Sequence, residues 1–580
     1  MKRRSHTYKG SHIHFNRITR QNLIEKQRHK LPRIHSSKNT GQLVPLFFDE
    51  VLPGDTVKVD MASLVRMATP LHPVMDNAFL DVHFYFCPMR LTWEHAKNFF
   101  GENTASPWIP SVSYTIPQIS IPTSGGDGVY NSSVAGFAKG TLGSYLTGTV
   151  ARNSDTISAL PFRAYCLIWN NYYRDQNVFS PVNVSLGDST TTGSNAGVAV
   201  NSGVPWTTGY NSYINNGTYV TAAQTGGALL PVCRFHDAFS SVLPGPQKGP
   251  SVTMPLGTLA PIVNDTSLSF PGVSPAWYLT PTSSTQATGT LIASSTGYTG
   301  NASYSGTTPG NTYIHLAADL SNATAATVNQ LRNAFMVQRF YEKLARGGSR
   351  YFEMIKAFFD VRVPDATVQI PEFLGGKRIP INITQVAQTS ATDDSLTDYT
   401  PLGSLSAYSL TTDTESDVFA KSFTEHGFLF AVCCIRTEHS YSQGMNRYWF
   451  KKTLTDFYLP TFANAPEQPV YTRELYVTGT SSDSSVFGYQ EAWYEYRYSP
   501  TIVSGEFNVD YAQALDSYHY GDDYSAAPSL SPGWLREPQL NVARTLAVQS
   551  HDQFLCDFLF NNKWVRAMPV YSVPGLLDHH

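Results

Sequence analysis

The strongest chemical signal in the sequence is the positive charge of its first forty residues. Eleven lysines and arginines stand there against one acid, Glu25, so residues 1–40 carry a net charge of +10 and residues 41–580 carry −13. Cations at this density, interleaved with aromatics such as Tyr8 and Phe15, are typical of sequence-tolerant contact with nucleic acid. We predict a nucleic-acid-contacting arm whose contacts are made by Lys2, Arg3, Arg4, Lys9, Arg17, Arg20, Lys26, Arg28, Lys30, Arg33 and Lys38.

A solvated tail without a partner is the alternative interpretation of this arm. The opposite charge of the body makes solubility an insufficient reason for so many cations. Histidines lie among the cations, but no cysteine or carboxylate cluster accompanies them, as a metal site would require. We interpret these histidines as polar or partly cationic surface beside phosphate: His6, His12, His14, His29 and His35.

Motifs of the common enzyme classes do not occur in the sequence. It contains no G-x-S-x-G, no H-E-x-x-H, no G-x-x-x-x-G-K-[ST], and no G-x-G-x-x-G in a strand-to-helix context. Catalytic groups can still be assembled in space, so the absence of motifs lowers the expectation of an enzyme without excluding one. We expect no catalytic residue, no metal and no cofactor.

Two local patterns allow both a chemical and a structural interpretation. Residues 346–350, Arg-Gly-Gly-Ser-Arg, could cradle a phosphate, but a helix C-terminus with flanking arginines is the favoured interpretation. Glu491, Glu495 and Arg497 lie among aromatic residues and could suggest a sugar site. We favour a solvated or interface strand, on which these three residues share one face.

The composition predicts a mainly β protein with a large core. Tyr (33), Phe (32), Gly (41) and Pro (36) are abundant, 42% of residues are hydrophobic and only 15% are charged. Residues 57–61 and 80–86 alternate between apolar and polar side chains, as half-buried strands do. A Pro-Gly turn at 52–55 precedes the first of them. Residues 427–435 are apolar on both faces, which predicts a central strand.

Helix signals are few, and the middle of the chain has an unusual composition. Apolar residues at three- and four-residue spacing predict a helix over 331–344 with a stop at Gly347, and a second short helix over about 351–359 before Pro364. Residues 189–318 are rich in Thr, Ser, Gly and Asn and hold only four formal charges. We interpret this range as an elaborated, surface-facing insertion.

Neither disulfides nor a membrane span are expected. Six cysteines are scattered without a C-x-x-C, so no disulfide framework or zinc site is indicated. The adjacent Cys433 and Cys434 lie in an apolar run and are interpreted as small hydrophobes. No apolar region follows the N-terminal cations, and the longest apolar run, 428–435, is too short to span a bilayer, so neither export by a cleavable signal nor membrane insertion is expected.

Several longer motifs are distributed over most of the chain outside 189–318. They are Leu43-Val44-Pro45, Asp49 to Asp55, Ala68-Thr69-Pro70, Pro73 to Asn77, Ala345 to Tyr351, Pro371 to Gly376, Tyr441 to Gly444, Phe487 to Glu491, Glu495 to Tyr498, Met568 to Tyr571 and Pro574 to His579. In these motifs and in their order, the sequence resembles the major capsid protein of microviruses, small icosahedral single-stranded DNA phages, and among them the gokushoviruses.

The resemblance implies an eight-stranded antiparallel jelly roll with long inter-strand insertions over residues 41–580. It implies that sixty copies form a T=1 shell around circular single-stranded DNA, with residues 1–40 facing the genome. The range 189–318 becomes the candidate for the family's threefold protrusions and for host attachment. Implied partners are minor capsid or pilot proteins, internal or scaffolding proteins and a host surface receptor. The implied location is the virion, with assembly in the bacterial cytoplasm and no membrane.

Two other classes of protein remain as alternatives. A secreted or surface carbohydrate-binding β-sandwich is disfavoured by the missing signal peptide and the scattered cysteines. A nucleic-acid enzyme with a basic tail would need a carboxylate or histidine cluster that the sequence does not display.

Overall fold

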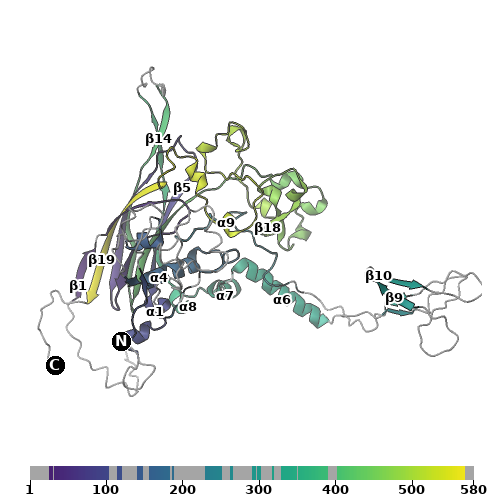
Figure 1. Ribbon diagram of the computed structural model, residues 1–580, viewed down its shortest axis with the longest axis horizontal. Coiled ribbons are helices and arrows are strands. Elements are labelled where there is room, and N and C mark those ends of the chain that lie inside the picture. Colours follow the sequence, from purple (N-terminus) through teal and green to yellow (C-terminus); the bar gives the residue numbers. More distant parts are fainter. Residues whose placement is uncertain are drawn as a thin grey trace, which may run out of the picture. The chain divides into compact units, whose positions relative to one another are not determined.

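The computed structural model describes residues 25–30, 32–102, 114–120, 140–147, 156–182, 184, 186–188, 229–250, 252, 328–348, 350–389 and 402–567, with four short strands between residues 262 and 318. The chain divides into two compact units, Met1–Pro246 with Leu344–His580, and Gln247–Lys343. The described residues are mainly β, with antiparallel sheets and few, mostly short helices (Figure 1). This confirms the mainly β, antiparallel part of the predicted fold class, with few helices.

The first large sheet joins the two ends of the described chain. Its strand order is β1-β19-β4-β15, and β2 also pairs with β19, so that β1 and β2 follow one another along the long strand β19 (Figure 1). Lys38 at the end of β2 lies opposite Phe554, and Glu25 at the start of β1 lies opposite Ala567. The strands are β1 (Glu25–Lys30), β2 (Arg33–Lys38), β4 (Thr56–Met67), β15 (Thr411–Ser422) and β19 (Phe554–Ala567).

The second large sheet has four antiparallel strands in the order β12-β5-β16-β3. Strand β16 lies between β5 and β3 and is buried on both faces, as its apolar sequence predicted. The predicted strands at 57–61 and 80–86 are likewise confirmed as parts of β4 and β5, although only β4 is half-buried and β5 is buried on both faces. The strands of this sheet are β3 (Val44–Val51), β5 (Ala78–Pro88), β12 (Glu372–Ile381) and β16 (Gly427–Thr437).

The two large sheets pack face to face around an aromatic core. The ring of Phe560 on β19 lies 4.8 Å from that of Phe47 on β3 and 5.9 Å from that of Phe84 on β5. Phe84 also packs at 5.5 Å against Phe419 on β15. Burying a phenylalanine side chain contributes about 1.5–3 kcal/mol. From β2 to β5 each successive strand changes sheet, and so do the four later strands of the large sheets, β12, β15, β16 and β19.

Helical segments cover the other face of the four-stranded sheet, which explains the double-sided burial of β16. In α4 (Leu160–Ile168), the hydroxyl of Tyr165 donates to the Leu43 carbonyl at 2.7 Å. The π-helical turn Trp169–Tyr173 continues α4, and its Tyr172 ring lies 4.7 Å from the ring of Tyr85. Short helices complete this region: α1 (Met89–Thr92), α2 (Ala96–Phe99) and α3 (Leu142–Thr147).

The two helices predicted around the Arg-Gly-Gly-Ser-Arg sequence are confirmed. Helix α6 (Val328–Gly347) ends where predicted, and α7 (Tyr351–Phe359) follows after Gly348, whose φ of +92° suits glycine. A Cβ atom on Gly347 would lie 2.4 Å from the Cβ of Ala357, so the turn needs glycine there as well. Helix α7 ends at Asp360, and α8 (Asp365–Val368) begins directly after Pro364.

The remaining elements are short. Small two-stranded sheets pair β6 (Gln118–Ser120) with β7 (Thr156–Ser158), β13 (Ile383–Ala387) with β14 (Leu405–Ser409), β17 (Gln468–Tyr471) with β18 (Val486–Gln490), β8 (Ile262–Asn264) with β11 (Leu316–Ala318), and β9 (Thr290–Ser294) with β10 (Gly297–Asn301). Two short α-helices are α9 (Pro532–Leu535) and α10 (Leu540–Ala543). The 3-10 turns are Arg447–Phe450, Leu454–Asp456, Pro460–Phe462, Thr472–Glu474, Ser481–Ser484, Tyr494–Tyr496, Gly505–Phe507 and Asp516–Tyr518.

The strand predicted over residues 491–498 is wrong. Strand β18 ends at Gln490, and the chain turns through Trp493, whose φ of 66° is left-handed, into a 3-10 turn. Tertiary contacts override the strand propensity here, since Trp493 is buried and its indole N–H donates to the Phe462 carbonyl at 2.9 Å.

The low-charge range 189–318 is not one continuous surface insertion. Residues 229–246 belong to the first unit, where Leu229, Leu230 and Val232 are buried in the core. The amide of Leu43 donates to the Leu230 carbonyl at 2.9 Å, and that of Val232 donates to the Gly41 carbonyl at 3.0 Å. This stretch is therefore part of the core of the first unit, and residues 189–228 lie outside the described residues. Within the described part of the chain, no helix is both long and apolar enough to cross a membrane.

Candidate functional site

The predicted nucleic-acid arm is anchored in the five-stranded sheet by its second half. Lys26 and Arg28 lie in β1, opposite Arg566 and Trp564 of β19. Six of the predicted contacts lie outside the described residues: Lys2, Arg3, Arg4, Lys9, Arg17 and Arg20.

Two further cations of the predicted arm form ion pairs within the sheet region. Lys30 Nζ lies 2.7 Å from Asp49 and 4.5 Å above the Trp564 ring. Arg33 donates to both carboxylate oxygens of Asp557, the shortest contact being 2.6 Å, although its side chain is 62% exposed. These two ion pairs help to hold the arm on the sheet. Each contributes only a little to stability, because it lies at the surface.

Lys38 is a correction to the predicted contact set. It is the last residue of β2, its side chain is fully buried, and Nζ lies 2.6 Å from Cys433 Sγ. A side chain enclosed between the two sheets cannot reach a phosphate. The period-2 alternation of β2 turns Lys38 inward, while Arg33 and His35 point outward.

The outer face of the five-stranded sheet carries further cations. Lys58 pairs with Asp417, and Lys563 Nζ lies 3.6 Å from Asp60. Arg66 is exposed, and no ion pair is formed by it among the described residues. Arg66 lines a shallow hollow of about 380 Å³ together with His35, Ser36, Ser37, Leu64, Leu555, Cys556 and Asp557.

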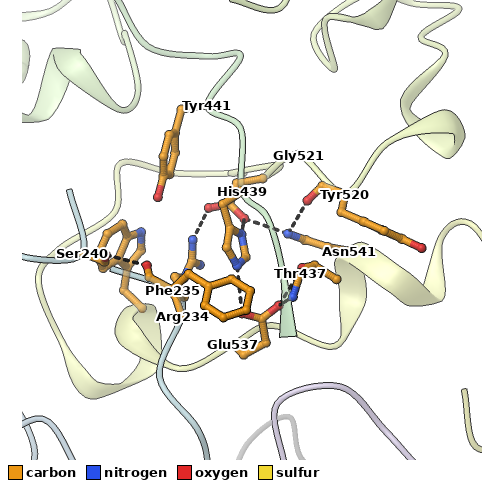
Figure 2. Close-up of polar contacts among 12 residues, drawn as sticks. Arg234, Phe235, Ser240, Thr437, His439, Tyr441, Tyr520, Gly521, Glu537 and Asn541 are labelled. Carbon is orange, nitrogen blue, oxygen red and sulfur yellow. Dashed lines mark hydrogen bonds and ion pairs between the residues drawn. The ribbon is translucent and has the colours of Figure 1, made fainter. Parts of the chain in front are cut away.

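A buried cluster of charged side chains centres on His439, just beyond β16 (Figure 2). The Nδ1 atom of His439 lies 3.0 Å from Asp522 Oδ1, and its Nε2 atom lies 2.9 Å from Glu537 Oε2. The guanidinium of Arg234 forms an ion pair with the other oxygen of Asp522. All four charged side chains are at least 95% buried.

Neutral groups complete the partners of the two carboxylates. Asp522 also accepts from the Asn541 amide at 2.7 Å and from the Tyr524 hydroxyl at 2.5 Å. Glu537 accepts from the Thr437 amide and hydroxyl at 2.9 and 2.6 Å. The cluster thus ties the end of β16 to three segments that are distant in sequence, around residues 234, 522 and 537–541.

The electrostatics of the cluster are strongly coupled. Burial alone would lower the pKa of His439, but the facing carboxylates of Glu537 and Asp522 outweigh burial and raise that pKa to about 9. Burial would raise the pKa of Asp522, and the charges of Arg234 and His439 instead hold it well below its usual range. At neutral pH two cations therefore face two carboxylates.

The arrangement is structural rather than catalytic. The carboxylates are saturated by fixed donors, and the side chains are closed off from solvent, so no substrate can reach them.

A cavity of about 590 Å³ lies nearby, lined by residues that include Tyr441, Arg447, Glu474 and Tyr494. Burial raises the pKa of Glu474, which accepts from the Tyr471 amide at 2.9 Å and from the Tyr494 hydroxyl. Among the described residues, no group of three His, Cys, Asp or Glu is placed to hold a metal ion.

The two ambiguous sequence patterns also take part in structural contacts. Arg346 pairs with Glu467, while Arg350 donates to Glu353 at 3.0 Å and to the carbonyls of Asn170 and Arg174. The favoured interpretation of residues 346–350 as a helix end with flanking arginines is confirmed. Glu491 pairs with Arg497 at 2.7 Å, and Glu495 lies 2.8 Å from Lys451.

Large apolar side chains are exposed in several places on the first unit. Phe359 at the end of α7 is 73% exposed, Trp449 is 74% exposed and Ile502 is 86% exposed. Tyr351, Tyr448, Leu454 and Leu540 are also exposed. Exposed apolar residues mark sites of association where they form a contiguous patch, whereas single ones are ordinary on a protein surface.

Comparison with known proteins identifies the family to which the chain belongs. Residues 12–576 match the family described as Capsid protein (F protein), and the chain belongs to this family. It is 35% identical over 554 residues to capsid protein VP1 of Spiroplasma virus 4, covering 93% of each chain. It is 34% identical to capsid protein VP1 of Chlamydia phage 1, covering 97% of this chain and 98% of that one. The VP1 of Bdellovibrio phage phiMH2K is 35% identical, over 95% of this chain and 96% of its own.

These relatives confirm the resemblance to gokushovirus-like microviruses that the sequence motifs suggested. The chain is a structural capsid protein and not an enzyme. Its place is the virion, where copies of it associate into a capsid. The exposed apolar side chains are the surfaces expected of such a subunit.

Proposed function

We propose that the chain forms a T=1 icosahedral shell of sixty copies around circular single-stranded DNA. The observation that carries this proposal is the agreement with capsid proteins over nearly the whole chain, together with the strand order of the two sheets. With β1 and β2 taken as one interrupted strand, the sheets hold the eight strands of a jelly roll. In that scheme one sheet has the order β1/β2-β19-β4-β15, and it packs against a second sheet with the order β3-β16-β5-β12.

Electron microscopy of the purified full-length chain tests this proposal. We expect uniform closed shells of one diameter. Ile502→Asp should prevent closure while leaving the subunit folded, because a charge on a buried interface between copies is costly. Thr501→Asp, at the neighbouring exposed position, is the matched control. Filaments, irregular aggregates or a persistent monomer of the unmodified chain would contradict the proposal.

The arm is proposed to contact the genome through the cations that precede the sheet. Its support is the charge of residues 1–40 together with Arg66, which forms no ion pair among the described residues and lines the same hollow as His35 of β2. Because residues 25–38 are strands and Lys38 is part of the core, deletion of all forty residues would damage the fold. The informative deletion therefore ends at residue 24.

Removing the charge of residues 1–24 without deleting them is the sharper test. Changing Lys2, Arg3, Arg4, Lys9, Arg17 and Arg20 to Gln keeps the length of the arm and removes six cations. The salt dependence of single-stranded DNA binding should then fall by about 4 in logarithmic slope, at about 0.7 per cation. Variants with substituted Asp or Glu residues on the outer surface serve as the control for non-specific effects of a change in net charge. An unchanged slope would show that the arm does not contact DNA.

Residues 189–228 and 247–318 are proposed to form the threefold protrusions and to contact a host surface receptor. Their support is a composition rich in Tyr, Asn, Ser and Thr with little charge, which suits adaptable recognition. Particles with a shortened 189–226 segment should assemble and lose adsorption to host cells. Normal adsorption would contradict this role. Pilot, internal or scaffolding proteins are further proposed partners, with assembly in the bacterial cytoplasm.

A further inference from the structure

Lys38 and Cys433 meet in the core between the two large sheets. Lys38 Nζ lies 2.6 Å from Cys433 Sγ, and both side chains are fully buried. Lys38 ends β2 in the five-stranded sheet, and Cys433 lies within β16 of the four-stranded sheet. The contact therefore joins the two layers of the sandwich between residues that are 395 positions apart.

The separation of these two atoms is short for a hydrogen bond. An N–H···O bond has a typical N···O distance of about 2.9 Å, and sulfur is a larger acceptor than oxygen. At 2.6 Å, the nitrogen and the sulfur atom are as close as two atoms that are both bonded to one atom between them. The geometry thus holds the amine and the thiol at reacting distance.

The charge of Lys38 is compensated less well than that of the other buried cations. Arg234 faces Asp522, and Arg163 donates to the backbone carbonyls of Thr92 and Gly187 at 3.1 and 3.0 Å. Among the described residues, the only hydrogen-bond acceptor of Lys38 Nζ is the sulfur of Cys433, with the Phe558 ring 4.9 Å away. Burying an ammonium without a carboxylate partner carries a large desolvation penalty.

The surrounding backbone keeps the two groups from separating. Lys38 pairs with Phe554 in the sheet, and the amide and hydroxyl of Thr40 both donate to the Gln553 side chain, at 2.9 and 2.8 Å. Cys433 is held between Val82 of β5 and Val44 of β3. Neither side chain has a path to solvent that would relieve the contact.

We propose that Lys38 and Cys433 form a covalent N–O–S bridge when the protein meets dioxygen. The Lys38 ammonium, the Cys433 thiol and one dioxygen give Lys–NH–O–S–Cys, one water and one released proton. Two N–H bonds, the S–H bond and the O–O bond break, while one N–O bond, one S–O bond and the two O–H bonds of water form. Nitrogen and sulfur each give up two electrons, and the two oxygen atoms take up all four.

The bridge would change the mechanical connection of the arm to the core. It replaces a buried positive charge by a neutral link and fastens β2, near the end of the basic arm, to the central strand of the opposite sheet. Two molecules of dithiothreitol supply the four electrons that restore the amine and the thiol. The link is thus a reversible, oxygen-dependent clamp between the two layers of each subunit.

Mass spectrometry of the unmodified full-length protein tests the bridge. One sample is kept under nitrogen with dithiothreitol, and a second is equilibrated with air after the reductant is removed. Both are denatured without reductant, alkylated and digested with trypsin. We expect the aerated sample to yield a joined pair of peptides containing Lys38 and Cys433, heavier than their sum by one oxygen and lighter by two hydrogens. Trypsin should fail to cleave after Lys38, and Cys433 should escape alkylation.

Variants and controls separate the bridge from other oxidation products. The joined peptides should vanish in Cys433→Ala and in Lys38→Met, and on treatment of the aerated sample with dithiothreitol. They should persist in Cys434→Ala, because the neighbouring residue on β16 points to the opposite face of the sheet. Full alkylation of Cys433 in the aerated wild-type protein would overturn the proposal. So would oxygen addition to Cys433 as a sulfinic acid with trypsin cleaving normally after Lys38.

Discussion

Two of the sites that bury positive charge in the core compensate it in opposite ways. Arg234 and His439 face the carboxylates of Asp522 and Glu537, so the cluster balances two cations with two anions. Lys38 is equally buried and faces a thiol and an aromatic ring. Burial is the same at both sites, so the difference in stability must come from the partners. Removing one partner from a balanced cluster leaves the other charge buried and uncompensated in a low-dielectric interior, which destabilises the fold. Removing a poorly compensated charge removes its desolvation penalty instead.

The largest loss is expected from Asp522→Asn. This change leaves Arg234 and His439 buried without their shared carboxylate, and breaking a buried pair in this way costs about 3–5 kcal/mol. The free energy of unfolding, measured by denaturant titration of the purified chain, should fall by that amount.

Asp523→Asn is the matched control, since the neighbouring carboxylate is exposed. It should change the free energy of unfolding by less than about 0.5 kcal/mol. Equal effects of the two variants would show that the cluster does not carry the stability assigned to it.

A smaller loss is expected at alkaline pH from His439 itself. The pKa of His439 in the folded protein is about 9, above the 6.5 of an exposed histidine. A raised folded-state pKa means that the stabilisation is fully present below pH 6.5 and is lost as the pH rises through about 9. The stabilisation lost over this pH range is on the order of 3 kcal/mol. It should appear as a fall in melting temperature between neutral pH and pH 10.

Two variants make the pH experiment specific. His439→Gln should be less stable at neutral pH and should lose most of the pH dependence in this window. His551→Gln, at an exposed position, should retain the wild-type profile. A wild-type profile in His439→Gln would assign the titration to another group.

A loss of about 1 kcal/mol is expected from Thr437→Val. Its hydroxyl donates to Glu537 Oε1 at 2.6 Å, and the substitution keeps the shape of the side chain while removing one donor. The Thr437 amide continues to donate to the same oxygen at 2.9 Å, which limits the cost. Thermal unfolding should register the change, and a loss as large as that of Asp522→Asn would mean that hydrogen bonds, not charges, dominate the cluster.

The fold could be predicted from sequence wherever local pattern and burial agree. The alternation over 57–61 and 80–86 and the apolar run at 427–435 each became strands, since period-2 hydrophobicity directly reports which face packs on the core. Residues 491–498 failed because their conformation is set by tertiary hydrogen bonds of Trp493 and Tyr494, which spacing does not encode.

The charged clusters could not be predicted from the sequence in the same way. Arg234, His439, Asp522 and Glu537 come from four segments, and no local spacing connects them. The positive charge of residues 1–40 was visible, but Lys38 was assigned to the arm because composition cannot reveal that the strand β2 turns it inward. The single available signal was alternation: Arg33, His35 and Ser37 share one face, which leaves Lys38 on the other.

No loss of stability is expected from Lys38→Met in the presence of reductant. Methionine fills a similar volume beside Cys433 and Phe558 without a charge, and replacing poorly compensated buried charge by an apolar side chain is neutral or stabilising by about 1–4 kcal/mol. The free energy of unfolding should therefore stay the same or rise. In air the order should reverse, because only the wild-type chain can form the bridge that holds β2 to β16. Melting temperatures of both proteins with and without dithiothreitol give the test: the wild type should depend on the reductant and Lys38→Met should not. A large loss in Lys38→Met under reducing conditions would show that the ammonium is well compensated and that the two buried sites do not differ.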